Sequence, residues 1–167
     1  MSKSVLLSIK PKYCKLIASG KKTVEVRKTK PELDTPFKCY IYCTKDFYRA
    51  GDGYFQGKYC GKVIGEFVCD NIIKFAAHKK ADNIKLSNMG LLSCLSSLEL
   101  ENYAGDKYYL YGFHISDLVI YDKPKELSEF CKPVDCHRGT QRDNCVGCWD
   151  CEITHPPQSW CYVEELI

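Results

Sequence analysis

Apolar residues in this 167-residue chain occur in short segments, and most of these segments alternate apolar and polar positions as half-buried strands do. Strands are expected at residues 5–9, 22–29, 38–45, 62–75, 108–121 and 160–166. Two segments, 11–19 and 95–103, have helical spacing, and residues 76–92 are predicted to form a polar loop or irregular insertion. This pattern favours a small mixed β-barrel of the α+β class with a few short helices.

Length and hydropathy predict a single domain over residues 1–167. An apolar share of 45% is enough to fill a core, so wholesale disorder is excluded. The apolar runs are too short to cross a bilayer or to serve as a signal peptide. We therefore expect a soluble, cytoplasmic protein with no membrane partner.

Positive charge is concentrated at the N-terminal end of the chain. Residues 1–30 hold nine Lys or Arg and one acid, Glu25, whereas residues 31–167 have a balance of −5. A basic segment in a folded chain favours an anionic partner, most simply nucleic acid. By charge alone, a solvated basic face with no partner is equally consistent.

The basic residues of this segment come from a strand end, a short helix and the following strand, where they can contact phosphates. The candidates are Lys10, Lys12, Lys15, Lys21, Lys22 and Arg27. Glu25 shares a strand face with Arg27 and can orient the guanidinium of Arg27 or accept a hydrogen bond from a base. A structural ion pair on a strand surface is the alternative.

An aromatic residue near the C-terminus is a second candidate for RNA contact. Trp160 follows two prolines and lies beside Gln158 and Ser159, which offer donors and acceptors next to a flat ring. Unpaired bases stack on such rings, although Trp160 can equally close the barrel. His114 can act as a general base, but a histidine in this setting is more often hydrogen-bonded structure.

Five cysteines crowd into residues 131–151, within an arm that spans residues 131–157. Spacing predicts one structural Zn²⁺ held by Cys136, Cys145, Cys148 and Cys151. Cys131 is the first substitute ligand, and His137 and His155 are weaker ones. The spacing of the last three cysteines also resembles iron–sulfur ligation, which stays open as an alternative.

Four ordered segments of the chain carry a recognisable pattern. Residues 19–27 read SGKKTVEVR, in which Gly20, Lys22, Glu25 and Arg27 are the characteristic positions. The other segments are SIKP at 8–11, GFHISDL at 112–118 and PPQSWCYV at 156–163. Together they resemble the ASCH domain family of the PUA-like superfamily, and in particular the ASCH proteins of bacteria and phages that carry a cysteine-rich insert.

The resemblance implies a PUA-like barrel that binds RNA in a cleft beside the first helix, more often without catalysis. Some small ASCH proteins hydrolyse acetylcytidine with a Lys, a Thr and a Glu, and their threonine stands three residues after the lysine. Counting from Lys22, that position holds Glu25. An RNA or modified-nucleoside hydrolase, amidohydrolase or ribonuclease-like, would use Lys22, Glu25 and His114. A third possibility is a phage or prophage protein that binds a host protein.

Overall fold

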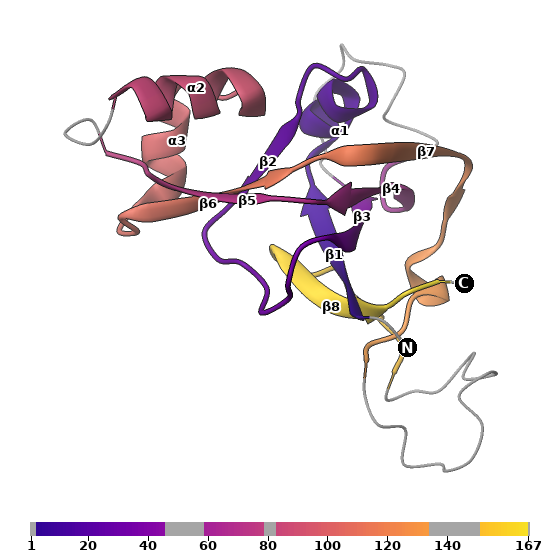
Figure 1. Ribbon diagram of the computed structural model, residues 1–167. Helices are drawn as coiled ribbons and strands as arrows, with labels where there is room; N and C mark the ends of the chain where they lie inside the picture. Colours follow the sequence, from indigo (N-terminus) through magenta and orange to yellow (C-terminus); the bar gives the residue numbers. More distant parts are fainter. Residues whose placement is uncertain (1–2, 46–58, 79–82, 134–150, 167) are drawn as a thin grey trace. The chain divides into compact units, whose positions relative to one another are not determined.

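The computed structural model describes residues 3–45, 59–78, 83–133 and 151–166 (Figure 1). The chain divides into two compact units. The first unit comprises Met1–Pro11, Lys38–Glu66 and Val119–Ile167, and the second comprises Lys12–Phe37 and Phe67–Leu118. Eight strands and three α-helices are found in the described residues: β1 (Lys3–Ile9), α1 (Pro11–Ala18), β2 (Val24–Arg27), β3 (Phe37–Cys43), β4 (Val63–Cys69), β5 (Ile72–Ala76), α2 (Asn83–Ser93), α3 (Ser97–Ala104), β6 (Tyr109–His114), β7 (Ser116–Lys125) and β8 (Trp160–Glu164), with a 3₁₀ turn at Leu127–Glu129.

The first unit is built on a five-stranded sheet in the order β7-β4-β3-β1-β8. Strand β1 runs parallel to β3 and antiparallel to β8. Alternate residues of these strands, including Leu6, Tyr40 and Val163, form one apolar core with Phe130. The sequence predicted β1, β3 and β8 within two residues at each end.

The second unit contains a three-stranded sheet in the order β2-β6-β5. Its core consists of Val24 and Val26 of β2, Phe75 of β5, Leu110 of β6 and apolar residues of α2 and α3. The two helices therefore cover one face of this sheet. Gly112 packs closely against this core, since a Cβ there would lie 2.8 Å from Val24 Cγ1 and the neighbouring side chains would have to shift.

Two expectations about the architecture are wrong. The strands of the described residues form two open sheets rather than a closed barrel. Alternation predicts which side chains face a core, but α2 and α3 supply the cover that a closing strand would otherwise give. The expected loop at residues 76–92 contains α2, where Leu86, Met89 and Gly90 are buried at i, i+3, i+4 spacing.

Local hydrogen bonds define the ends of α2 and α3. Helix α3 begins with a capping box, in which Ser96 Oγ accepts from the Glu99 N–H at 3.2 Å and Glu99 accepts from the Ser96 N–H at 2.8 Å. Helix α2 is followed by Cys94, whose φ is 55°, and the Leu95 N–H donates to the Gly90 carbonyl.

The three α-helices found in the described residues are all too short to cross a membrane.

Candidate nucleic-acid interface

Lys22, Glu25 and Arg27 form a buried charge cluster in the second unit. Lys22 Nζ lies 3.2 Å from Glu25 Oε2, and Arg27 Nη2 lies 3.0 Å from Glu25 Oε1. The three side chains are only 1%, 8% and 8% exposed, respectively. One carboxylate therefore pairs with two cations, one through each of its oxygens. From the sequence, an orienting bond from Glu25 to Arg27 in a ligand cleft and a structural ion pair on a strand surface are alternatives; the structure pairs Glu25 with both cations and buries all three side chains.

Strand β2 places two members of this cluster, Glu25 and Arg27, on one face of the sheet. Val24 and Val26 enter the core under α2 and α3, so Glu25 and Arg27 point to the opposite face. The antiparallel register sets Glu25 against Phe113 and Arg27 against Tyr111. Along this four-residue strand, side chains therefore alternate between the apolar core and the charge cluster.

The C-terminal end of α2 fixes Lys22 from the other side. Lys22 Nζ donates to the Ser93 carbonyl at 2.7 Å, and the Thr23 N–H donates to the Leu92 carbonyl at 2.9 Å. The Cys94 thiol donates to the Lys21 carbonyl at 3.4 Å. A helix C-terminus carries partial negative charge, so it favours an ammonium group here. The loop before β2 is therefore tied to α2 by three contacts.

Two tyrosines flank the cluster. The Tyr13 ring lies 5.2 Å from Lys22 Nζ, and Arg27 donates a hydrogen bond to the Tyr103 hydroxyl. Burial, and then the negative charges of Glu99 and Glu25, raise the pKa of Tyr13. Burial also raises the pKa of Tyr103, against the opposing effect of the Arg27 charge. Both hydroxyls are neutral donors at physiological pH. Sequence analysis missed both tyrosines.

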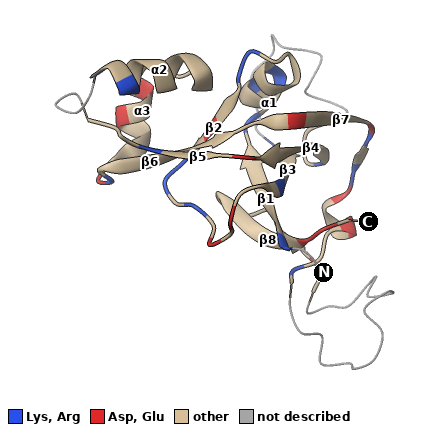
Figure 2. Ribbon diagram, viewed as in Figure 1, with Lys and Arg blue, Asp and Glu red and all other residues tan. Residues whose placement is uncertain are grey.

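The remaining basic residues of the N-terminal segment are exposed. Figure 2 marks the positions of Lys and Arg along the ribbon in blue. Exposed lysines in residues 3–30 are Lys3, Lys10, Lys12, Lys15, Lys21, Lys28 and Lys30. Glu25, the segment's one acid, is buried between Lys22 and Arg27. Lys12 lies 4.0 Å from Glu99, an exposed ion pair that water and salt weaken.

His114 lies apart from the charge cluster. The β2–β6 register sets His114 opposite Val24, so its side chain belongs to the sheet face opposite Glu25. His114 Nδ1 is 2.6 Å from Asp70 Oδ1, and this hydrogen bond lowers the pKa of Asp70. The structure therefore does not bring Lys22, Glu25 and His114 to one point.

The C-terminal candidates belong to the first unit, as does Lys10. The Ser159 carbonyl accepts from the Ser8 N–H at 3.0 Å, which anchors the start of β8 on β1. The Trp160 ring is half-buried and packs edge-on against Tyr162 at 5.3 Å, whereas Gln158 is exposed.

The predicted metal site falls largely outside the described residues, which include Cys151 but not Cys136, Cys145, Cys148 or His137. In the described part of the chain no group of three metal-ligating side chains is found. The two ends of the arm pair through their backbones: Cys131 and Glu152 form an isolated β-bridge, and the Lys132 N–H donates to the Cys151 carbonyl at 2.8 Å. Two of the substitute ligands are described. Cys131 forms the β-bridge with Glu152, and His155 is exposed and hydrogen-bonded to Thr154.

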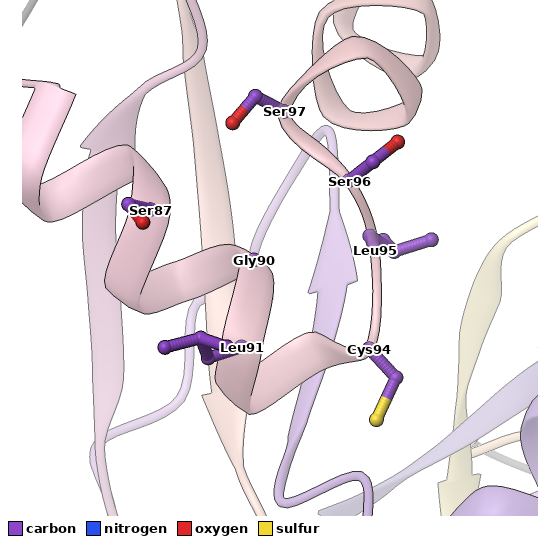
Figure 3. A pocket seen from close by; sticks show the side chains of 7 residues that line it. All are labelled: Ser87, Gly90, Leu91, Cys94, Leu95, Ser96 and Ser97. Carbon is purple, nitrogen blue, oxygen red and sulfur yellow. The ribbon is translucent and has the colours of Figure 1, made fainter.

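A hollow of about 340 Å³ lies between the end of α2 and the start of α3 (Figure 3). Its lining includes Ser87, Leu91, Cys94 and Ser97. No Lys, Arg, Asp, Glu or His is among the residues that line it, so the hollow has no charged group suited to an anion. The hollow is therefore not part of the charged site. Cys94 nevertheless contacts both, because it lines the hollow and its thiol donates to the Lys21 carbonyl.

The described residues form a mixed α+β domain that combines exposed lysines in its N-terminal segment with a buried Lys–Glu–Arg cluster. Residues 7–152 match the ASCH domain family, and the chain belongs to that family. The match crosses both units, and the prediction of one domain over residues 1–167 stays a prediction.

The fold is similar to solved structures of an ASCH protein from Zymomonas mobilis. A tyrosine-to-phenylalanine variant of that protein has a TM-score of 0.65 at 22% identity, covering 98% of this chain and 92% of that chain. A serine-to-alanine variant has a TM-score of 0.63 at 21% identity, covering 97% and 89%. The unaltered protein has a TM-score of 0.58 at 21% identity, covering 97% and 88%. Among curated proteins, no sequence matches this chain.

Proposed function

We propose that this ASCH domain binds RNA through exposed lysines of α1 and of the loop before β2. The carrying observation is the distribution of charge in residues 3–30. Their one acid is buried and paired, while seven lysines of the same segment are exposed. A segment with exposed cations and no exposed acid of its own attracts a phosphate backbone.

The buried cluster has a supporting role in this proposal. Lys22 and Arg27 are too deeply buried to contact phosphate directly in this conformation. They instead hold the loop that presents Lys21, because Lys22 donates to the Ser93 carbonyl and both cations pair with Glu25.

The hydrolase alternative is not favoured by the contacts of Glu25. Both carboxylate oxygens of Glu25 are occupied by cations, and His114 lies on the other sheet face. No contact among the described residues favours a host-protein partner over RNA. The arm of residues 131–157 stays a proposed zinc site, and its content is independent of the basic surface.

The test is a salt titration of RNA binding by fluorescence anisotropy. Wild type is compared with the triple variant Lys12→Ala, Lys15→Ala, Lys21→Ala, which removes three exposed charges near the cluster. The matched control removes three exposed lysines elsewhere: Lys85→Ala, Lys123→Ala, Lys132→Ala.

Single-stranded RNA contributes about 0.7 to the slope of log affinity against log salt per phosphate contact, so the triple variant should lose about 2 from that slope. The control should keep the wild-type slope, although its net charge is the same as that of the triple variant. Absence of binding by the wild type at low salt, or equal slopes for both triples, would overturn the proposal.

A further inference from the structure

The most exposed aromatic residues of the described chain are two neighbouring tyrosines at the start of β6. Tyr108 and Tyr109 are 54% and 45% exposed, and every other described Phe, Tyr or Trp is buried or half-buried. Their ring centroids are 4.7 Å apart at an interplanar angle of 75°. The His78 ring lies 5.3 Å from Tyr108, and Lys74 Nζ lies 4.1 Å from the centre of the Tyr109 ring.

The backbone holds these rings on a regular ladder rather than on a loose loop. Tyr109 pairs with Ala76 in the β5–β6 ladder, and the Ala77 N–H donates to the Tyr108 carbonyl at 3.1 Å. The next residues on each strand, Phe75 and Leu110, are buried in the core under α2 and α3. The rings are thus preorganised, which lowers the entropic cost of binding a ligand against them.

The charge around the rings selects the kind of ligand. Lys74 and Lys107 are both exposed, and Asp106 is the exposed acid nearest in sequence. An aliphatic protein partner gains little from a cation over an aromatic ring. A nucleotide matches both features, because its base stacks on a ring and its phosphate pairs with an ammonium group.

We propose that Tyr108 and Tyr109, with His78 and Lys74, form a stacking site for an unpaired base of single-stranded RNA. This inference rests on the proposed function and adds a second contact region to the lysines of α1. Both regions belong to the second unit and are linked by α3. Glu99 near the start of α3 pairs with Lys12, and the Lys107 N–H donates to the carbonyl of Ala104, the last residue of α3.

The separation of the two regions suits one continuous strand. Helix α3 has eight residues, which corresponds to a rise of about 12 Å along its axis. A strand of a few nucleotides can therefore reach from the α1 lysines to the tyrosine pair. Duplex RNA cannot use the tyrosines, because its bases are already stacked and paired.

The experiment compares Tyr108→Leu, Tyr109→Leu with the wild type on single-stranded and duplex RNA. Leucine keeps apolar bulk but removes the aromatic face, and the thermal midpoint of each variant reports folding. Tyr162→Leu is the control for loss of a half-buried aromatic in the other unit. We expect single-strand affinity to fall at least tenfold in the double variant, with an unchanged salt slope and unchanged duplex binding.

Ultraviolet crosslinking to uridine-rich RNA, read by mass spectrometry, gives a second measurement. Crosslinks are expected on the peptide that holds Tyr108 and Tyr109, and the double variant should lose them. If the wild type binds single-stranded RNA, the inference is overturned by wild-type affinity in the double variant or by crosslinks only elsewhere. Failure of the wild type to bind any RNA would instead overturn the proposed function itself.

Discussion

Glu25 Oε2 lies 3.2 Å from Lys22 Nζ in a setting where both side chains are more than nine-tenths buried. The second oxygen of the same carboxylate is held by Arg27. Removing a buried carboxylate from such a cluster leaves two cations without their counter-ion, which is far more costly than removing an exposed ion pair. We therefore expect the cluster to contribute mainly to the stability of the fold.

We expect Glu25→Gln to lower the free energy of unfolding by roughly 3–5 kcal/mol, measured by urea denaturation. A loss of this size is a large part of the stability of a typical domain. The control is Asp106→Asn, which changes an exposed carboxylate just beyond the end of α3 and should alter stability by less than about 0.5 kcal/mol. Equal stability of Glu25→Gln and Asp106→Asn would show that the cluster is solvated.

The capping box of α3 predicts a pH dependence of stability. Hydrogen bonds from the Ser96 backbone N–H and then from its hydroxyl lower the pKa of Glu99 in the folded chain. A folded pKa below the unfolded value means that the unfolded chain binds the proton more tightly, so Glu99 stabilises the fold above the unfolded pKa of about 4.3. That contribution disappears as pH falls through the lower, folded pKa.

The measurement is the difference in unfolding free energy between wild type and Glu99→Gln at pH 6 and at successively lower pH. We expect wild type to be more stable at pH 6 by up to about 1 kcal/mol, since the group is exposed. The difference should shrink steadily below about pH 4, as the carboxylate takes up a proton. A difference that grows on acidification would contradict the sign of the Glu99 shift.

The sequence predicted the features of this site that depend on neighbouring residues, but not those that depend on partners far along the chain. Alternation in residues 22–29 correctly separated Val24 and Val26 from Glu25 and Arg27. It could not predict burial of Lys22, because that burial depends on the Ser93 carbonyl, 71 residues away on α2. Lysine is also seldom buried unless it is paired, so an exposed position was the reasonable expectation.

Helix α2 escaped prediction for a related reason. Ile84 and Leu91 are 75% and 76% exposed, while Leu86 and Met89 are buried, so apolar residues occur on more than one face. Its first turn has no acidic residue and its last turn no basic one, which removes the usual signals at helix ends. Without this helix, the sequence pattern indicated many strands with only two short helices, and that balance favoured a small barrel.

Catalytic inactivity toward acetylcytidine is a third expectation. By the resemblance stated from the sequence, counting from Lys22 would put Glu25 where the threonine nucleophile is expected, and both oxygens of Glu25 are paired with cations. Thr23 is half-buried and its backbone is tied to Leu92 and Ile115. We expect no release of acetate above background in a chromatographic assay. Turnover that is lost in Thr23→Val, with folding retained, would assign Thr23 as an alternative nucleophile.

The cysteine arm carries the last prediction, which is one Zn²⁺ per chain held by Cys136, Cys145, Cys148 and Cys151. Two thiolates in one C-x2-C turn bind a metal with little loop-closure cost, and four satisfy a closed tetrahedral site. The base of the arm supports a local site, since the Cys131–Glu152 bridge brings its two ends together. Burial raises the pKa of Cys161, which disfavours the thiolate form needed for a ligand at that position.

Elemental analysis of the purified protein is the measurement, with Cys145→Ser, Cys148→Ser as the test variant and Cys94→Ser as the control. We expect zinc near one equivalent in wild type and in the control, and a large loss in the test variant. Structural zinc can contribute on the order of 10 kcal/mol to local folding, so chelation should expose residues 131–157 to protease while the two apolar cores stay folded. If the protein instead contains iron and shows a visible absorption band, the site is an iron–sulfur cluster and not a zinc site. Zinc retained in Cys136→Ser but lost in Cys131→Ser would exchange Cys136 for Cys131 as the fourth ligand.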